Sequence, residues 1–154
     1  MTRIYNDCNY VDIDNLRFFL DFDHYPKIIK TYEAVDSIIC SLKLIGPSNS
    51  KSISDHFNTS RIVAFISLVS LDCDSDFKDF FISGNNLISG SLVANGESVD
   101  DSVTFTFKML KFNVVGKYKL GISVVDMSRV LESSVNDHSS LILSKIVSGD
   151  IEIV

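Results

Sequence analysis

The stretch that decides the fold is Ser102–Met127, which reads SVTFTFKMLKFNVVGKYKLGISVVDM. Apolar side chains occupy every second position of both halves: Val103, Phe105, Phe107 and Met109 in the first, and Tyr118, Leu120, Ile122 and Val124 in the second. Successive side chains of a strand point to opposite faces, so this alternation predicts two antiparallel strands, each with one buried face. The break at Asn113–Gly116 predicts either a β-hairpin or a corner between two sheets.

The other candidate strands are short and are separated by polar loops. They are Arg17–Asp23, Ser37–Leu44, Ile62–Leu71, Phe80–Ile82, Leu87–Ala94, Leu141–Ile146 and Asp150–Val154. Gly90 predicts a bulge inside the fifth of these, whereas Asn95–Asp101 and the Ser148-Gly149 pair predict turns. Strands of this density with little helical periodicity are typical of a sandwich or barrel.

Length and composition agree with this pattern. The 154 residues predict one domain, residues 1–154, in which the segment 1–15 is either flexible or an edge strand. Eleven phenylalanines and no tryptophan predict a core of phenylalanine and β-branched side chains. We therefore expect an all-β fold, an antiparallel β-sandwich of about eight strands with little helix.

Most kinds of functional site find no support in the sequence. The acidic cluster Asp72, Asp74, Asp76 and Asp79 lacks the glycine and glutamate of a calcium-binding EF-hand loop. No nucleophile elbow and no phosphate-binding glycine loop is present. No segment approaches the roughly 20 apolar residues of a membrane span. We expect no enzymatic activity, no cofactor, no metal, no membrane and no small-molecule substrate.

The lysines are the most informative charged residues. The formal net charge is −6, so the field of the whole chain repels polyanions, and a nucleic-acid site needs a local concentration of cations. Lys27 and Lys30 flank an apolar pair after Pro26. A second group surrounds the break at Asn113–Gly116: Lys108, Lys111, Lys117 and Lys119. Converging lysines bind phosphate, but lysines also keep strand surfaces from aggregating, and spacing alone favours the second interpretation.

Three segments, taken in order, resemble the velvet domain of fungal developmental regulators. They are Ala64–Leu71 (AFISLVSL), Asn86–Ala94 (NLISGSLVA) and Thr104–Met127 (TFTFKMLKFNVVGKYKLGISVVDM). The second is similar to the family's LxGSLVSS strand, and the third contains the GxYxLxxSxxD/E core of a longer family motif. Leu20–Lys30 and Leu141–Val154 fit the family more loosely, so the resemblance covers most of residues 16–154.

The resemblance implies a sandwich of the immunoglobulin or Rel-homology type. It also implies a nuclear transcriptional regulator, exchanging with the cytoplasm, that pairs with itself or with another velvet-like protein. It implies contact with double-stranded DNA through a basic N-terminal loop, with Lys27 and Lys30 as contacts and Lys43 and Arg61 as further candidates. Asp21 and Asp23 stand where the family has an arginine, which favours a member that acts mainly through dimerisation. The alternative is a β-sandwich interaction or structural module that binds no nucleic acid.

Overall fold

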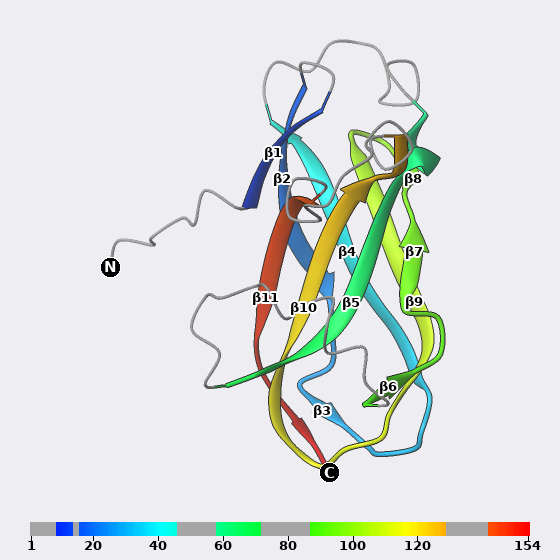
Figure 1. Cartoon of the computed structure of the whole chain (residues 1–154), viewed down its shortest axis with the longest axis vertical. Coiled ribbons are helices and arrows are strands. Elements are labelled where there is room, and N and C mark those ends of the chain that lie inside the picture. Colours follow the sequence, from blue (N-terminus) through cyan, green and yellow to red (C-terminus); the bar gives the residue numbers. More distant parts are fainter. Residues whose placement is uncertain (1–8, 14–15, 46–57, 72–86, 129–141) are drawn as a thin grey trace, which may run out of the picture.

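The protein is built from strands that form two sheets (Figure 1). The structure, a computed structural model, describes residues 9–13, 16–45, 58–71, 87–128 and 142–154. The six-stranded sheet has the order β1 (Tyr10–Ile13), β2 (Leu16–His24), β4 (Val35–Ile45), β9 (Ser102–Phe112) and β6 (Ile88–Ser89), and β8 (Glu97–Val99) also pairs with β9. The five-stranded sheet has the order β3 (Ile28–Ile29), β11 (Ile142–Ile153), β10 (Gly116–Asp126), β5 (Ile62–Ser70) and β7 (Val93–Asn95).

These elements confirm the expected all-β class. Within the described ranges, helical structure is limited to the 3-10 turn η3 (Thr59–Arg61), Asn9 and the pair Met127 and Ser128. The described strand pairs are antiparallel except for β3 with β11, which run parallel. Of the segment 1–15, residues 1–8 and 14–15 lie outside the described residues. β1 pairs with β2 at one edge of the six-stranded sheet.

A single cluster of buried apolar side chains contains residues from both sheets. Its largest fully buried members include Phe18, Phe105, Phe107 and Phe112 from the six-stranded sheet and Leu120 and Ile122 from β10. The phenylalanine-rich core predicted from composition is therefore present. Removal of this apolar surface from water is the main stabilising contribution to such a fold.

The two deciding strands are joined by a corner. β9 belongs to the six-stranded sheet and pairs with β4, whereas β10 belongs to the other sheet and pairs with β5 and β11. The chain therefore changes sheets between Phe112 and Gly116, where Gly116 has a φ of 142° that favours glycine. Of the two predicted alternatives, the corner is confirmed and the hairpin is wrong.

The alternation in β9 is interrupted at Met109, which was expected on the buried face. Val103, Phe105 and Phe107 are buried, but Met109 is exposed and the buried positions resume at Leu110. Met109 has a φ of 57°, so the strand takes one residue in a left-handed conformation and its inward-facing positions shift by one. The expectation for Met109 is wrong because a single residue in a left-handed conformation, which the alternation does not reveal, turns its side chain to the surface while the register with β4 is kept.

Three further predictions need correction. Leu87–Ala94 is two short strands, because Gly90, with a φ of 110°, separates β6 from β7, and these pair with different sheets. Ser148 and Gly149 lie inside the continuous strand β11 and coincide with an irregularity in its pairing with β10. The predicted turn Asn95–Asp101 contains the strand β8. Phe80–Ile82 and the acidic cluster of residues 72–79 lie outside the described residues.

Gly96 is the point at which the chain leaves β7 for β8 and so passes between the sheets. A Cβ atom placed there would lie 2.7 Å from the Thr59 carbonyl oxygen and 2.6 Å from Cγ1 of Val103. The Gly96 amide donates a hydrogen bond to the Ile62 carbonyl at 2.8 Å. This corner therefore has room only for glycine.

We predict that Gly96→Ala lowers the free energy of unfolding by about 1–3 kcal/mol, because overpacking against fixed backbone atoms forces the corner apart. Urea denaturation followed by circular dichroism measures the change. Ser98→Ala, on the exposed part of β8, is the matched control and should leave the stability nearly unchanged. Equal stability of Gly96→Ala and the native chain would contradict the close approach.

Candidate nucleic-acid interface

The two lysines that the resemblance selects flank the short strand β3. After β2 the chain crosses from the six-stranded to the five-stranded sheet, pairs with the end of β11, and then returns to form β4. The amides of Glu152 and Val154 donate hydrogen bonds to the carbonyls of Lys27 and Ile29, both at 2.8 Å. The Thr31 amide donates to the Val154 carbonyl at 2.9 Å. These bonds fix Lys27 and Lys30 at the two ends of β3, where both are exposed.

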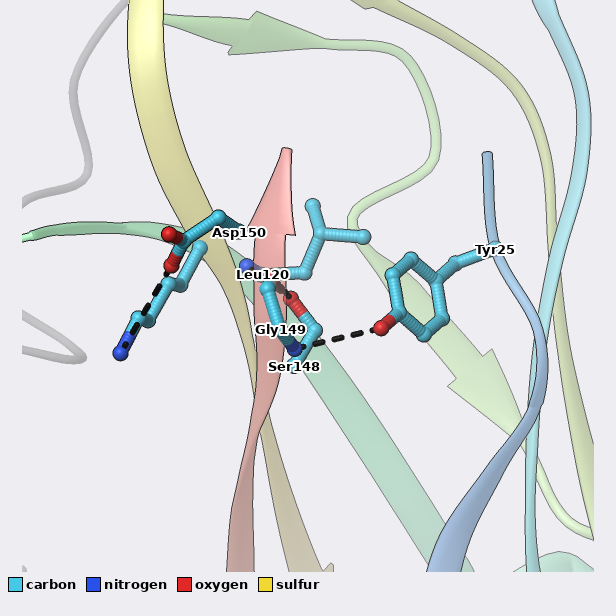
Figure 2. A network of polar contacts seen from close by, with 6 residues as sticks. Tyr25, Leu120, Ser148, Gly149 and Asp150 are labelled. Atoms are coloured by element: carbon cyan, nitrogen blue, oxygen red, sulfur yellow. Dashed lines mark hydrogen bonds and ion pairs between the residues drawn. The ribbon is translucent and has the colours of Figure 1, made fainter. Parts of the chain in front are cut away.

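The crossing from β2 to β3 is held by Tyr25 (Figure 2). Its hydroxyl accepts a hydrogen bond from the Gly149 amide at 3.2 Å, and its ring lies edge-on to Phe22 with centroids 5.1 Å apart. Beside this contact, the Leu120 amide donates to Oγ of Ser148 at 2.8 Å. The irregular part of β11 therefore supplies a backbone donor that Tyr25 satisfies, and this contact anchors the segment leading to Lys27.

Three chain segments meet at this end of the molecule. We call residues 27–33, 108–117 and 152–154 together the β3 end; in Figure 1 they lie at the bottom, with β3, the β9–β10 connection and the C-terminus side by side. The Tyr32 amide donates to the Phe112 carbonyl at 3.1 Å, which joins the β3–β4 turn to the last residue of β9. The Thr31 amide and hydroxyl both donate to the Val154 carbonyl.

The β3 end is positively charged, although the chain as a whole is acidic. It contains Lys27, Lys30, Lys108, Lys111 and Lys117, all exposed, and two carboxylates, those of Glu33 and Glu152. In the part of the chain that the structure describes, none of these lysines forms an ion pair. Asp36 and Asp150 lie just outside the β3 end, and Asp150 is 3.9 Å from Nζ of Lys119. Five lysines and two glutamates give the β3 end a formal charge of +3, against −6 for the whole chain.

Lys43 and Arg61, the further candidates from the resemblance, lie elsewhere. Nζ of Lys43 is 3.1 Å from Oδ1 of Asp23, and the other oxygen of that carboxylate accepts a 2.6 Å hydrogen bond from the Ser41 hydroxyl. Arg61 is 3.5 Å from the buried carboxylate of Asp126, next to the start of β5 at the opposite end of the molecule (Figure 1). The structure thus places Lys27 and Lys30 at the two ends of β3 and leaves Lys43 and Arg61 apart from them.

Lys111 and Lys117 join Lys27 and Lys30 at the β3 end, although the resemblance does not select them. The sequence shows that they flank the break between β9 and β10. That break is a corner between the two sheets, and it lies at the same end of the molecule as β3. A hairpin interpretation would not have predicted that Lys111 and Lys117 lie near β3.

Other kinds of site find little support in the described residues. The thiol of Cys40 is buried in the core, and burial, followed by the nearby charge of Asp23, raises its pKa well above the usual value. No group of three metal-binding side chains occurs among the residues that the structure describes. The described elements also include no helix with the length and apolar character that a membrane crossing requires.

The sequence matches no protein-family model and no curated protein.

We predict that Tyr25→Phe lowers the free energy of unfolding by about 1 kcal/mol, because the Gly149 amide loses its acceptor while the ring contact with Phe22 remains. Guanidinium denaturation measures the loss. Tyr32→Phe is the matched control, since the Tyr32 ring is exposed and its hydroxyl has no partner in the described residues. If both variants were as stable as the native chain, Tyr25 would not anchor the crossing.

Proposed function

We propose that this chain is a velvet-like regulatory domain: a sandwich of the immunoglobulin or Rel-homology type that pairs with itself or with a related chain and contacts the phosphates of double-stranded DNA through its β3 end. Such a regulator works in the nucleus. The observation that carries the proposal is the gathering of exposed lysines beside β3 and at the β9–β10 corner, at one end of an otherwise acidic domain, with no ion pair to any described residue.

The strand order supports the fold part of this proposal. One sheet contains β2, β4, β9 and β8 as successive neighbours, and the other contains β3, β11, β10, β5 and β7. If β2 and β3 are counted as two parts of one first strand divided between the sheets, these orders correspond to A-B-E-D and A′-G-F-C-C′ of an immunoglobulin-like sandwich. A divided first strand whose second part runs parallel to the last strand agrees with the β3–β11 pair.

The electrostatics of the β3 end support the DNA part. Each lysine that approaches a phosphate releases condensed counterions, which is the main source of sequence-independent affinity. Lys27 and Lys30 lie on one sheet, and Lys111 and Lys117 enter from the two strands at the corner. Contacts from separate segments fix the orientation of a duplex better than contacts from a single loop. The ammonium group of Lys43 is already paired with the carboxylate of Asp23 and is therefore less available to bind phosphate.

The second candidate is a protein-interaction module without a nucleic-acid role. It is favoured by the exposed apolar side chains of the same end, among them Ile28 and Val115, because large exposed apolar patches mark interaction surfaces. The salt dependence of DNA binding separates the two candidates.

We predict that the double variant Lys27→Ala/Lys30→Ala binds duplex DNA more weakly than the native protein and reduces the slope of log affinity against log salt by about 1.8, since each lost phosphate contact removes about 0.9. Fluorescence anisotropy with a labelled random-sequence duplex over a salt series measures both quantities.

Lys43→Ala is the matched control for this experiment, and its slope should equal that of the native protein. Lys111→Ala/Lys117→Ala should behave like the first double variant. Absence of binding at low salt, with the chain alone and with a co-expressed velvet-like partner, would exclude the DNA role and leave the interaction module.

A further inference from the structure

The β3 end also carries the most exposed large apolar side chains of the described residues. Ile28, Tyr32, Met109, Val115 and Val154 are between 51% and 70% exposed, and no other described large apolar residue exceeds 50%. They come from β3, the β3–β4 turn, the left-handed position of β9, the β9–β10 corner and the end of the described chain. Isolated exposed apolar residues are ordinary, but the most exposed ones of a domain gathered at one end indicate a surface that is covered by a partner.

The backbone holds two of these side chains in the solvent. Tyr32 and Met109 have φ values of 63° and 57°, a region that bulky residues occupy at a cost. The Tyr32 amide is fixed by its bond to the Phe112 carbonyl, so the turn keeps its shape. The carbonyl of Met109 would lie 2.9 Å from a Cβ on Gly90, so the chain at Gly90 closely approaches the backbone of Met109. These backbone contacts therefore hold the surface at this end in one conformation.

Four of the apolar residues form what we call the end patch: Ile28, Tyr32, Val115 and Val154. Ile28, Glu152 and Lys117 are direct neighbours across β3, β11 and β10, so their side chains share the outer face of the five-stranded sheet. Val154 follows Glu152 by two positions, and Lys30 follows Ile28 by two, which continues the same face. Lys30, Lys117 and Glu152 therefore share this face with Ile28 and Val154, while Tyr32, Glu33 and Val115 are exposed on the adjoining turn and corner.

We propose that the end patch is the interface through which two copies of this chain pair, about a two-fold axis. This inference rests on the dimer part of the proposed function and assigns that dimer a surface. A two-fold interface must be complementary to itself, and a patch with an apolar centre and both signs of charge at its border meets this condition. Lys30 and Lys117 of one copy then face Glu33 and Glu152 of the other.

The mixed charge favours a second copy over a purely anionic partner at this patch. Glu152 lies between Ile28 and Lys117 in one row of side chains, so an acidic surface seated there would meet a carboxylate at its centre. A second copy would instead place one of its own lysines opposite Glu152. Lys27 and Lys111 lie outside the patch, so the pairing leaves them free for phosphate, whereas Lys30 and Lys117 can reach phosphate only in a chain that is not paired through the patch. A dimer placed in this way matches the two-fold symmetry of a palindromic DNA site.

The test is sedimentation velocity on the whole chain over a range of micromolar concentrations. We expect a monomer–dimer equilibrium for the native chain, at least tenfold weaker association for Ile28→Asp and Val115→Asp, and unchanged association for Val99→Asp. Val99 is half exposed on β8, away from the patch, which makes it the matched control. Thermal denaturation by circular dichroism establishes that each variant is folded.

Charge reversal adds a measurement that does not depend on burying aspartate. Lys117→Glu should weaken the dimer, and Lys117→Glu combined with Glu152→Lys should restore it, because both sides of the two-fold contact reverse together.

The outcomes separate this inference from the proposed function. A native dimer that Ile28→Asp and Val115→Asp leave intact overturns the interface and leaves the dimer standing. A native chain that is monomeric throughout overturns both the interface and self-pairing. Equal loss in Val99→Asp also overturns the interface. Lys27→Ala/Lys111→Ala, whose two lysines lie outside the patch, tests DNA binding independently of the interface.

Discussion

The parallel pairing of β3 with the end of β11 is the contact on which the candidate functional end depends. It consists of few hydrogen bonds, from Glu152 and Val154 to the carbonyls of Lys27 and Ile29, with Thr31 closing on Val154. Ile29 and Ile153 are buried beneath it and belong to the common core. Through this pairing a two-residue strand determines where Lys27, Ile28 and Lys30 stand. Without it the crossing from β2 to β4 would have no fixed place on the five-stranded sheet.

The remaining features of this end follow from local departures from regular strand geometry. The left-handed conformation of Met109 reverses the facing of β9 just before the corner, so Leu110 and Phe112 remain buried while Lys111 faces the solvent. The irregularity around Ser148 and Gly149 presents an amide to Tyr25, which ties the crossing to β11. Bulges commonly re-aim side chains in this way. Here they combine a cationic group and an apolar group at one end of an acidic protein.

The sequence was sufficient to predict the all-β class, the main strands and the buried phenylalanines, because alternation directly reflects the side-chain period of a strand. It was insufficient at Met109 and at Ser148-Gly149. A single residue in a left-handed conformation, or one extra residue in a strand ladder, has no signature in the residue types of the strand. Lys27 and Lys30 were selected by resemblance alone. Lys111 and Lys117 were visible as a cluster, but their proximity to β3 depends on long-range pairing that spacing does not encode. The ion pairs of Lys43 and Arg61 likewise arise only in the folded chain.

The most direct test of this account is native-state amide hydrogen exchange at Thr31, Glu152 and Val154, measured by NMR on the whole chain. The account predicts slow exchange at all three amides, close to that of neighbouring amides in β10, because each donates to a carbonyl across the β3–β11 pair. Exchange at the rate of an unstructured peptide at Glu152 and Val154, with β10 still protected, would show that β3 does not dock on β11. The β3 end would then not exist as a fixed surface.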